Sequence, residues 1–160
     1  MDRVFFGHIQ LKGSLAYIAK TQSALVCLQT ADLAAVVWNL VSQLREARRT
    51  GVFPYMDLAV IDVGGRTWNS TTIWYAGAIA HEGFHVKLYR EAKVRNGKRD
   101  PKGNTWTGVE AEKKCLEFQL RVLQELRAED GVLDYVREGM KSPTYQGDPF
   151  SRKDFLMRNW

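Results

Sequence analysis

Residues 81–85 constrain the fold of this chain more than any other part of its sequence. They read H-E-G-F-H, an H-E-x-x-H pattern, inside a segment (75–89) that is predicted to be helical. Histidines four positions apart lie one helical turn apart on the same face, so the imidazoles of His81 and His85 can reach a single metal ion. Glu82 points toward the same space, where a carboxylate can act as the base for a metal-activated water. The competing interpretation is a pair of surface histidines beside an unrelated glutamate.

A third metal ligand is expected on another element, because a catalytic zinc ion is held by three protein ligands and keeps one position open. A long helix is predicted over 108–128, and on it Glu112 is followed at helical spacing by a mostly apolar face: Cys115, Leu116, Gln119, Leu123 and Leu126. A carboxylate that points into a core is costly unless a cation pairs with it. Glu112 is therefore the predicted third ligand, with Cys115 as the alternative. Gln119 is predicted to hydrogen-bond to a ligand or to pack between helices.

Glu110 lies on the other face of the same predicted helix. The residues that continue this face at helical spacing are charged: Lys113, Lys114, Glu117 and Arg121. That face is expected to meet solvent. Residues 107–110 (T-G-V-E) also match a capping box, in which Thr107 caps the helix and Glu110 bonds back to it. Glu110 is therefore not the predicted ligand.

An H-E-x-x-H helix followed by a glutamate on a downstream helix resembles the gluzincin branch of the zincin metallopeptidases, and especially their small single-domain members. The resemblance covers roughly residues 73–126. It implies a zinc-dependent metallopeptidase that hydrolyses a peptide or protein substrate with a zinc-activated water. It also implies that His81, His85 and Glu112 bind Zn²⁺ and that Glu82 is the general base. The longer metzincin pattern is excluded, because positions 88 and 91 hold leucine and glutamate.

The same resemblance implies two further parts of the site. One is a donor that stabilises the oxyanion, for which Tyr145 is the first candidate and the others are His8, Tyr89 and Arg158. The other is an edge strand that lines the cleft and pairs with an extended substrate, which residues 68–74 would supply. The alternatives are that Tyr145 packs on the surface and that the tryptophans at 68 and 74 only anchor the core.

The remaining periodicity predicts an α+β fold with few strands in a single domain that spans residues 1–160, and the resemblance implies that this domain is zincin-like. Strands are expected at 2–12, 56–63 and 71–74, helices at 31–49, 75–89, 108–128 and 132–140, a polar loop at 94–106, and an irregular tail at 143–160. Residues 14–28 fit either a short helix or an extended segment. Three arginines (Arg45, Arg48 and Arg49) suit the C-terminal end of the first predicted helix.

Charge and composition leave one competing function open. The chain has a net charge of +5, and residues 87–102 are rich in lysine and arginine. A non-catalytic protein on a zincin scaffold would bind a protein or nucleic-acid partner through this basic loop, although such a loop is more often simply solvated. An intact Glu82 argues against it. A hydrolase of a non-peptide amide is a third possibility.

No signal peptide or membrane span is predicted, and the two cysteines suit reduced thiols, so a cytoplasmic location without a membrane partner is expected.

Overall fold

The protein is described by a computed structural model, which covers residues 1–55, 58–102 and 105–141. The fold is α+β, as the sequence predicted, and its sheet has five strands in the order β1-β2-β3-β5-β4. The strands are β1 (Asp2–Phe6), β2 (Ile9–Gly13), β3 (Gln43–Ala47), β4 (Gly51–Phe53) and β5 (Val60–Gly64). The three inner strands are parallel to one another, whereas β1 and β4 run antiparallel to their neighbours at the two edges.

The two faces of the sheet differ in polarity because side chains alternate along each strand. Leu11, Leu44 and Ile61 are aligned across β2, β3 and β5, and each of them is at most 1% exposed. One position further on, Arg45 lies opposite Asp62 and donates two hydrogen bonds to its carboxylate, at 2.7 and 3.0 Å. The sheet therefore presents one face to the core and a polar face on the other side.

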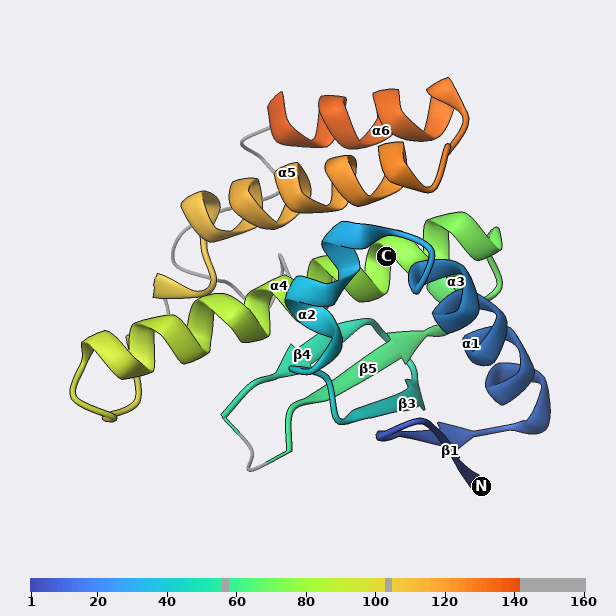
Figure 1. Cartoon of the computed structure of the whole chain (residues 1–160), viewed down its shortest axis with the longest axis horizontal. Helices are drawn as coiled ribbons and strands as arrows, with labels where there is room; N and C mark the ends of the chain where they lie inside the picture. The colour runs from blue at the N-terminus through green and yellow to red at the C-terminus, as the bar shows by residue number, and fades with distance from the viewer. Residues whose placement is uncertain (56–57, 103–104, 142–160) are drawn as a thin grey trace.

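The helices lie on the core side of the sheet (Figure 1). They are α1 (Leu15–Leu28), the 3-10 turn η1 (Asp32–Ala34), α2 (Ala35–Trp38), α3 (Gly65–Trp68), α4 (Thr72–Arg95), α5 (Val109–Glu125) and α6 (Asp130–Lys141). Helix α4 contacts α1 and the strands β4 and β5, α5 packs on α4, and α6 packs on α5 as the outermost layer. In the described ranges, no helix combines the length and the apolar character needed to cross a bilayer.

Helix α4 carries the H-E-x-x-H pattern and is longer than the predicted span of 75–89. It begins after Thr71, whose side chain accepts a hydrogen bond from the backbone N–H of Trp74 at 3.2 Å, as an N-cap does. It ends at Asn96, and Gly97 follows with a φ of 63°, the left-handed conformation that terminates many helices. Most of its central residues are buried because α4 lies between α1 and the sheet on one side and α5 on the other.

The helix predicted over 31–49 is wrong. The chain forms only η1 and α2 there, then leaves the helical path after Trp38 and enters β3. Val37, Val41 and Leu44 recur at helical spacing and are buried, but Leu44 is buried on the sheet, and Val36, which belongs to the same apolar pattern, is 40% exposed. A short helix followed by a strand buries the same three positions as one long helix. The outcome depends on the pairing of β3 with β2 and β5, which local periodicity does not report.

The strand predicted over 71–74 and the edge strand predicted over 68–74 are also wrong. Those residues form the end of α3, the cap at Thr71 and the first turn of α4. The edge strand on this side of the sheet is β4, which has only three residues. Elsewhere, the predicted strand 2–12 is a hairpin that turns at Gly7 with a φ of 58°, and the ambiguous segment 14–28 is the helix α1.

Two glycines let other helices approach α4 closely. A Cβ atom added at Gly83 would lie 2.9 Å from the Cβ of Val37 in α2, and one added at Gly77 would lie 2.7 Å from Leu123 in α5. The close neighbour of Gly83 is therefore the helix α2, and that of Gly77 is the helix α5. Glycine at position 77 thus brings α5 close to the helix that carries the two histidines.

Replacement of Gly83 by alanine should destabilise the protein by about 1–2 kcal/mol, because overpacking against Val37 outweighs the gain of about 1 kcal/mol in helix propensity. Gly139 in α6 is a matched control, since a Cβ there would lie 3.9 Å from Leu116 in ordinary contact. Gly139→Ala should therefore be neutral or stabilising. Urea denaturation of both variants measures the two effects. Equal stability of Gly83→Ala and the parent protein would contradict this packing.

Candidate metal centre

Three buried side chains from α4 and α5 converge. The Nε2 atom of His81 lies 3.3 Å from Oε2 of Glu112, and the Nε2 atom of His85 lies 3.3 Å from Oε1 of the same carboxylate. His81 is 4% exposed, His85 3% and Glu112 1%. The prediction that Glu112 faces inward is confirmed, and Glu110 is exposed, as predicted. The structure thus brings together the two histidines and the glutamate that the sequence singled out.

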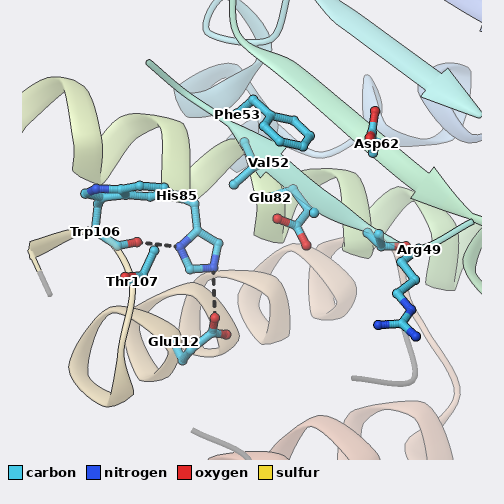
Figure 2. Close-up of a pocket in the computed structure, with 11 residues that line it drawn as sticks. Arg49, Val52, Phe53, Asp62, Glu82, His85, Trp106, Thr107 and Glu112 are labelled. Carbon is cyan, nitrogen blue, oxygen red and sulfur yellow. Dashed lines mark hydrogen bonds and ion pairs between the residues drawn. The ribbon is translucent and has the colours of Figure 1, made fainter. Parts of the chain in front are cut away.

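The other ring nitrogen of each histidine bonds to an acceptor outside this group. Nδ1 of His85 donates to the backbone carbonyl of Trp106 at 2.7 Å, and Nδ1 of His81 lies 3.1 Å from Oε1 of Gln119. Because a carbonyl oxygen can only accept, the proton of a neutral ring is on Nδ1 and the lone pair is on Nε2. Both lone pairs then face the Glu112 carboxylate. Figure 2 shows this arrangement for His85, between Trp106 and Glu112.

Two lone pairs that face a carboxylate repel it unless a positive charge lies between them. The separations of 3.3 Å are longer than charge-assisted N–H···O hydrogen bonds, which are about 2.7–2.9 Å. Ligands of a tetrahedral zinc ion, at about 2.0–2.2 Å from the metal, lie about 3.4 Å from one another. The donor types and the histidine orientation therefore suit a divalent metal ion such as zinc, and each 3.3 Å separation, made by a different oxygen of Glu112, is close to that between two zinc ligands. Hydrogen bonds from Nδ1 to outer acceptors are also typical of metal-binding histidines.

The pKa shifts of His85 and Glu112 also favour a positive charge between these side chains. Burial would lower the pKa of His85, but the neighbouring Cys115 and Glu112 raise that pKa well above its usual range. Burial would raise the pKa of Glu112, but His85 and His81 hold it well below its usual range. Both directions are those expected where a positive charge lies beside the Glu112 carboxylate. A bound cation can supply that charge.

Cys115, the alternative third ligand, also lies at this centre. It is fully buried one turn after Glu112, and ligand atoms of His81, His85 and Cys115 lie within 4.8 Å of one another. Both candidates from α5 therefore reach the two histidines, and the contacts at 3.3 Å belong to Glu112. Burial is the main cause of the raised pKa of the Cys115 thiol, and it favours the neutral form of this side chain.

A cavity of about 330 Å³ opens beside the centre and next to the edge strand β4. Its lining includes Glu82, His85 and Glu112 together with Arg49, Thr50, Gly51, Val52, Phe53, Asp62, Trp106 and Thr107. Figure 2 shows Glu82 between His85 and Arg49, with Val52 and Phe53 on the facing wall. This volume is within the usual range for ligand-binding pockets. The arrangement therefore combines a candidate set of metal ligands, the second carboxylate of Glu82, and space for a small ligand.

The two candidates for the oxyanion donor in the described part of the chain, His8 and Tyr89, do not line this cavity. His8 lies in the turn between β1 and β2, with its Nε2 3.1 Å from the carbonyl oxygens of Trp38 and Val41. Tyr89 donates a hydrogen bond to Asp100 at 2.6 Å. Neither side chain lines the cavity. Tyr145 and Arg158 lie outside the described residues.

Sequence reasoning missed two parts of the site and was wrong about a third feature. Trp106 contributes through its backbone carbonyl, which no side-chain pattern reports. Arg49 lies in the loop between β3 and β4 rather than at a helix end. The capping box at 107–110 is wrong, because Gly108 caps α5 without a side-chain hydrogen bond. The position of Arg49 depends on the course of β3 and β4, for which the sequence has no local signal.

Several basic side chains of the segment 87–102 make contacts within the fold. Lys87 pairs with Glu91, and Lys93 pairs with Asp100 at 2.8 Å. The guanidinium of Arg90 donates to the carbonyl of Leu40 at 3.3 Å. These contacts favour a structural role for part of the segment over a surface devoted to a partner.

Comparisons of the chain with protein-family models, with curated proteins and with solved structures gave no match. The interpretation of the site therefore depends on its own geometry.

Replacement of Gln119 by leucine should weaken zinc binding by about 10- to 100-fold, the usual effect of removing a partner that orients a metal ligand. The variant removes the acceptor for Nδ1 of His81 while it keeps the volume of the side chain. Gln124→Leu is the control, because Gln124 is exposed on the same helix. Competition with a chromophoric chelator measures both zinc affinities. An unchanged zinc affinity in Gln119→Leu would show that Gln119 does not orient His81 for metal binding.

Proposed function

We propose that this protein is a zinc-dependent metallopeptidase of the zincin type, with His81, His85 and Glu112 as the zinc ligands. The observation that carries the proposal is the approach of both histidine Nε2 atoms to the Glu112 carboxylate at 3.3 Å, beside a cavity that Glu82 also lines. A helix with two ligands, a downstream helix with a third and a mixed sheet beside them also agree with the zincin arrangement.

Zinc, when bound, would supply Lewis-acid chemistry that polarises a carbonyl and lowers the pKa of water toward neutrality. Glu82 would accept the proton of the attacking water and later deliver it to the leaving amine. Gln119 and the carbonyl of Trp106 would hold the two imidazoles in place. The edge strand β4, which contributes its three residues to the cavity wall, would pair with the backbone of an extended peptide.

The experiment that tests this function combines metal analysis with hydrolysis of an unfolded protein such as casein. The purified protein should contain one zinc ion per chain, lose activity with a chelator and regain it with zinc. Zinc without hydrolysis would favour a non-catalytic scaffold instead. Absence of both would reject the proposal.

A second candidate function follows from the position of Cys115. If its thiolate completes a four-ligand site with His81, His85 and Glu112, no position remains open and the zinc is structural. The metallopeptidase proposal predicts that Cys115→Ser retains stoichiometric zinc and activity within about twofold, since a neutral buried thiol acts as a small apolar side chain. Cys27→Ser is the matched control at a position outside the centre. Loss of zinc in Cys115→Ser alone would favour the structural site.

A further inference from the structure

The C-terminal end of α4 and the turn after it carry a cluster of cations that the candidate metal centre does not use. Four basic residues lie close together there, and all of them are exposed: Arg95, Lys98, Arg99 and Lys102. Within the described ranges, none of these four side chains forms an ion pair or a hydrogen bond. Figure 1 shows this end of α4 extending past the sheet. These four residues are called the basic tip below.

The carboxylate inside this segment is already compensated. Asp100 accepts a hydrogen bond from the ammonium of Lys93 at 2.8 Å and another from the hydroxyl of Tyr89 at 2.6 Å. These two donors, Lys93 first, hold the pKa of Asp100 below its usual value. Lys93 does not belong to the basic tip, so the pair that it forms with Asp100 leaves the four cations of the tip uncompensated.

The backbone of the basic tip is a hydrogen-bonded turn. The N–H of Lys98 donates to the carbonyl of Lys93 at 2.8 Å, and the N–H of Arg99 donates to the carbonyl of Asn96 at 3.3 Å. The side-chain amide of Asn96 donates to the carbonyls of Arg99 and Asp100, at 3.4 and 3.3 Å. Lys98 and Arg99 are therefore carried on a backbone that is already fixed, which lowers the entropy lost when a ligand binds.

Lys98 has a backbone conformation that is unusual for lysine. Its φ is 66°, directly after Gly97 with a φ of 63°. This left-handed region is strained for a residue with a Cβ atom, and glycine or asparagine is the usual choice there. Strained backbone of this kind is concentrated at functional sites. A binding role for the ammonium group gives a reason for lysine at position 98 that the contacts within the fold do not supply.

The chemistry of the basic tip favours a phosphate backbone over other anions. An acidic peptide is usually recognised through pockets that bury anchor side chains, whereas the tip presents its charges on the exposed end of a helix and a turn. The apolar residue beside the tip is Val94, which is 74% exposed, and a single valine is too small to anchor a protein in a bilayer. Nucleic-acid phosphates need neither feature, because lysine and arginine bind them at the surface with release of counterions.

We propose that the basic tip is a nucleic-acid binding site, in which Lys98 and Arg99 contact backbone phosphates and Arg95 and Lys102 contact phosphates on either side. Arginine offers paired N–H donors to a phosphate, and lysine offers a point charge. Contacts to the backbone carry no base information, so binding should not depend on sequence. The inference goes beyond the proposed hydrolysis and does not depend on it.

The test measures the affinity of the whole chain for labelled oligonucleotides of mixed sequence by fluorescence anisotropy, over about 50–200 mM salt. The probes are duplex DNA, duplex RNA and single-stranded DNA, and the competitors are polyglutamate and phosphatidylserine vesicles. One variant replaces all four residues of the basic tip by glutamine. The matched control replaces four exposed cations that have no ion pair in the described ranges: Lys20, Lys113, Lys114 and Arg121. Thermal denaturation checks that both variants are folded.

The parent protein should bind nucleic acid with a Kd of about 10⁻⁴–10⁻⁶ M at physiological salt. If all four cations contact phosphates of duplex DNA, log affinity should fall against log salt with a slope of about −3.6. The tip variant should lose most of this affinity and slope, and the control should retain both. Lys98→Gly alone should reduce the slope by about 1 and keep or raise Tm, since glycine adopts the left-handed φ without strain.

An equal loss of binding in the tip variant and the control would show that only net charge matters, and it would overturn the proposal. Absence of binding at the lower salt concentration would also overturn it, as would equally tight binding of polyglutamate or of the vesicles. The probe that binds most tightly identifies the kind of nucleic acid. Zinc content and peptide hydrolysis of the parent protein test the proposed function separately, and the tip variant should match the parent protein in both.

Discussion

Replacement of Glu82 by glutamine should lower kcat for peptide hydrolysis by about 10²–10⁴-fold, the usual contribution of a general acid–base group. The amide keeps the shape of the side chain but cannot accept a proton. Zinc content should stay unchanged, because Glu82 lines the cavity while the close contacts with the histidines belong to Glu112. Steady-state kinetics on a fluorogenic peptide, together with metal analysis of the same samples, measures both effects.

The control for this variant is Glu117→Gln, which changes an exposed glutamate on α5 and should leave kcat unaltered. If Glu82→Gln hydrolyses the peptide as fast as the parent protein, Glu82 is not the base, and any hydrolysis observed comes from another group. If Glu82→Gln loses both activity and zinc, the residue acts through the metal site itself.

Replacement of Glu112 by glutamine should remove stoichiometric zinc, with a loss of affinity greater than the 10- to 100-fold typical of residues outside the ligand set. The variant takes away the charge that both histidine Nε2 atoms face. Zinc at about 100 times its Kd should stabilise the parent protein by about 2.7 kcal/mol, which corresponds to a rise in Tm of about 5–10 °C. Glu112→Gln should show little rise. Differential scanning calorimetry with and without zinc measures the shift.

Glu110→Gln is the matched control, because Glu110 is exposed and lies two positions earlier on the same helix. It should bind zinc and gain stability as the parent protein does. An equal rise in Tm for Glu112→Gln and Glu110→Gln would show that the carboxylate at position 112 is not a ligand. Cys115 would then be the favoured third ligand.

The parts of the site that the sequence predicted are those that depend on local helical geometry. The spacing of His81 and His85 determines that they share a face of α4. The phase of α5 determines that Glu112 and Gln119 face inward, and they are 1% and 3% exposed. In each case a single periodic helix carries the information, so no knowledge of distant pairing is needed.

The parts that the sequence did not predict depend on pairing between distant segments. The helix predicted over 31–49 includes 43–47 because Leu44 continues the helical spacing of Val37 and Val41, whereas the partners of 43–47 in the sheet are far away in sequence. Strand β4 has three residues, too few to show any alternation. Arg49 reaches the cavity only because these two strands place it there. Non-local pairing therefore sets one wall of the cavity, whereas local periodicity places His81, His85 and Glu112 at the candidate metal centre.

The most direct test of the central claim is a crystal structure of the zinc-loaded protein with anomalous diffraction data collected at the zinc absorption edge. The account predicts one strong anomalous peak, at about 2.0–2.2 Å from Nε2 of His81, Nε2 of His85 and a carboxylate oxygen of Glu112. It also predicts a remaining position that faces the cavity beside Glu82. A peak elsewhere, no peak, or a site closed by the sulfur of Cys115 at about 2.3 Å would contradict it.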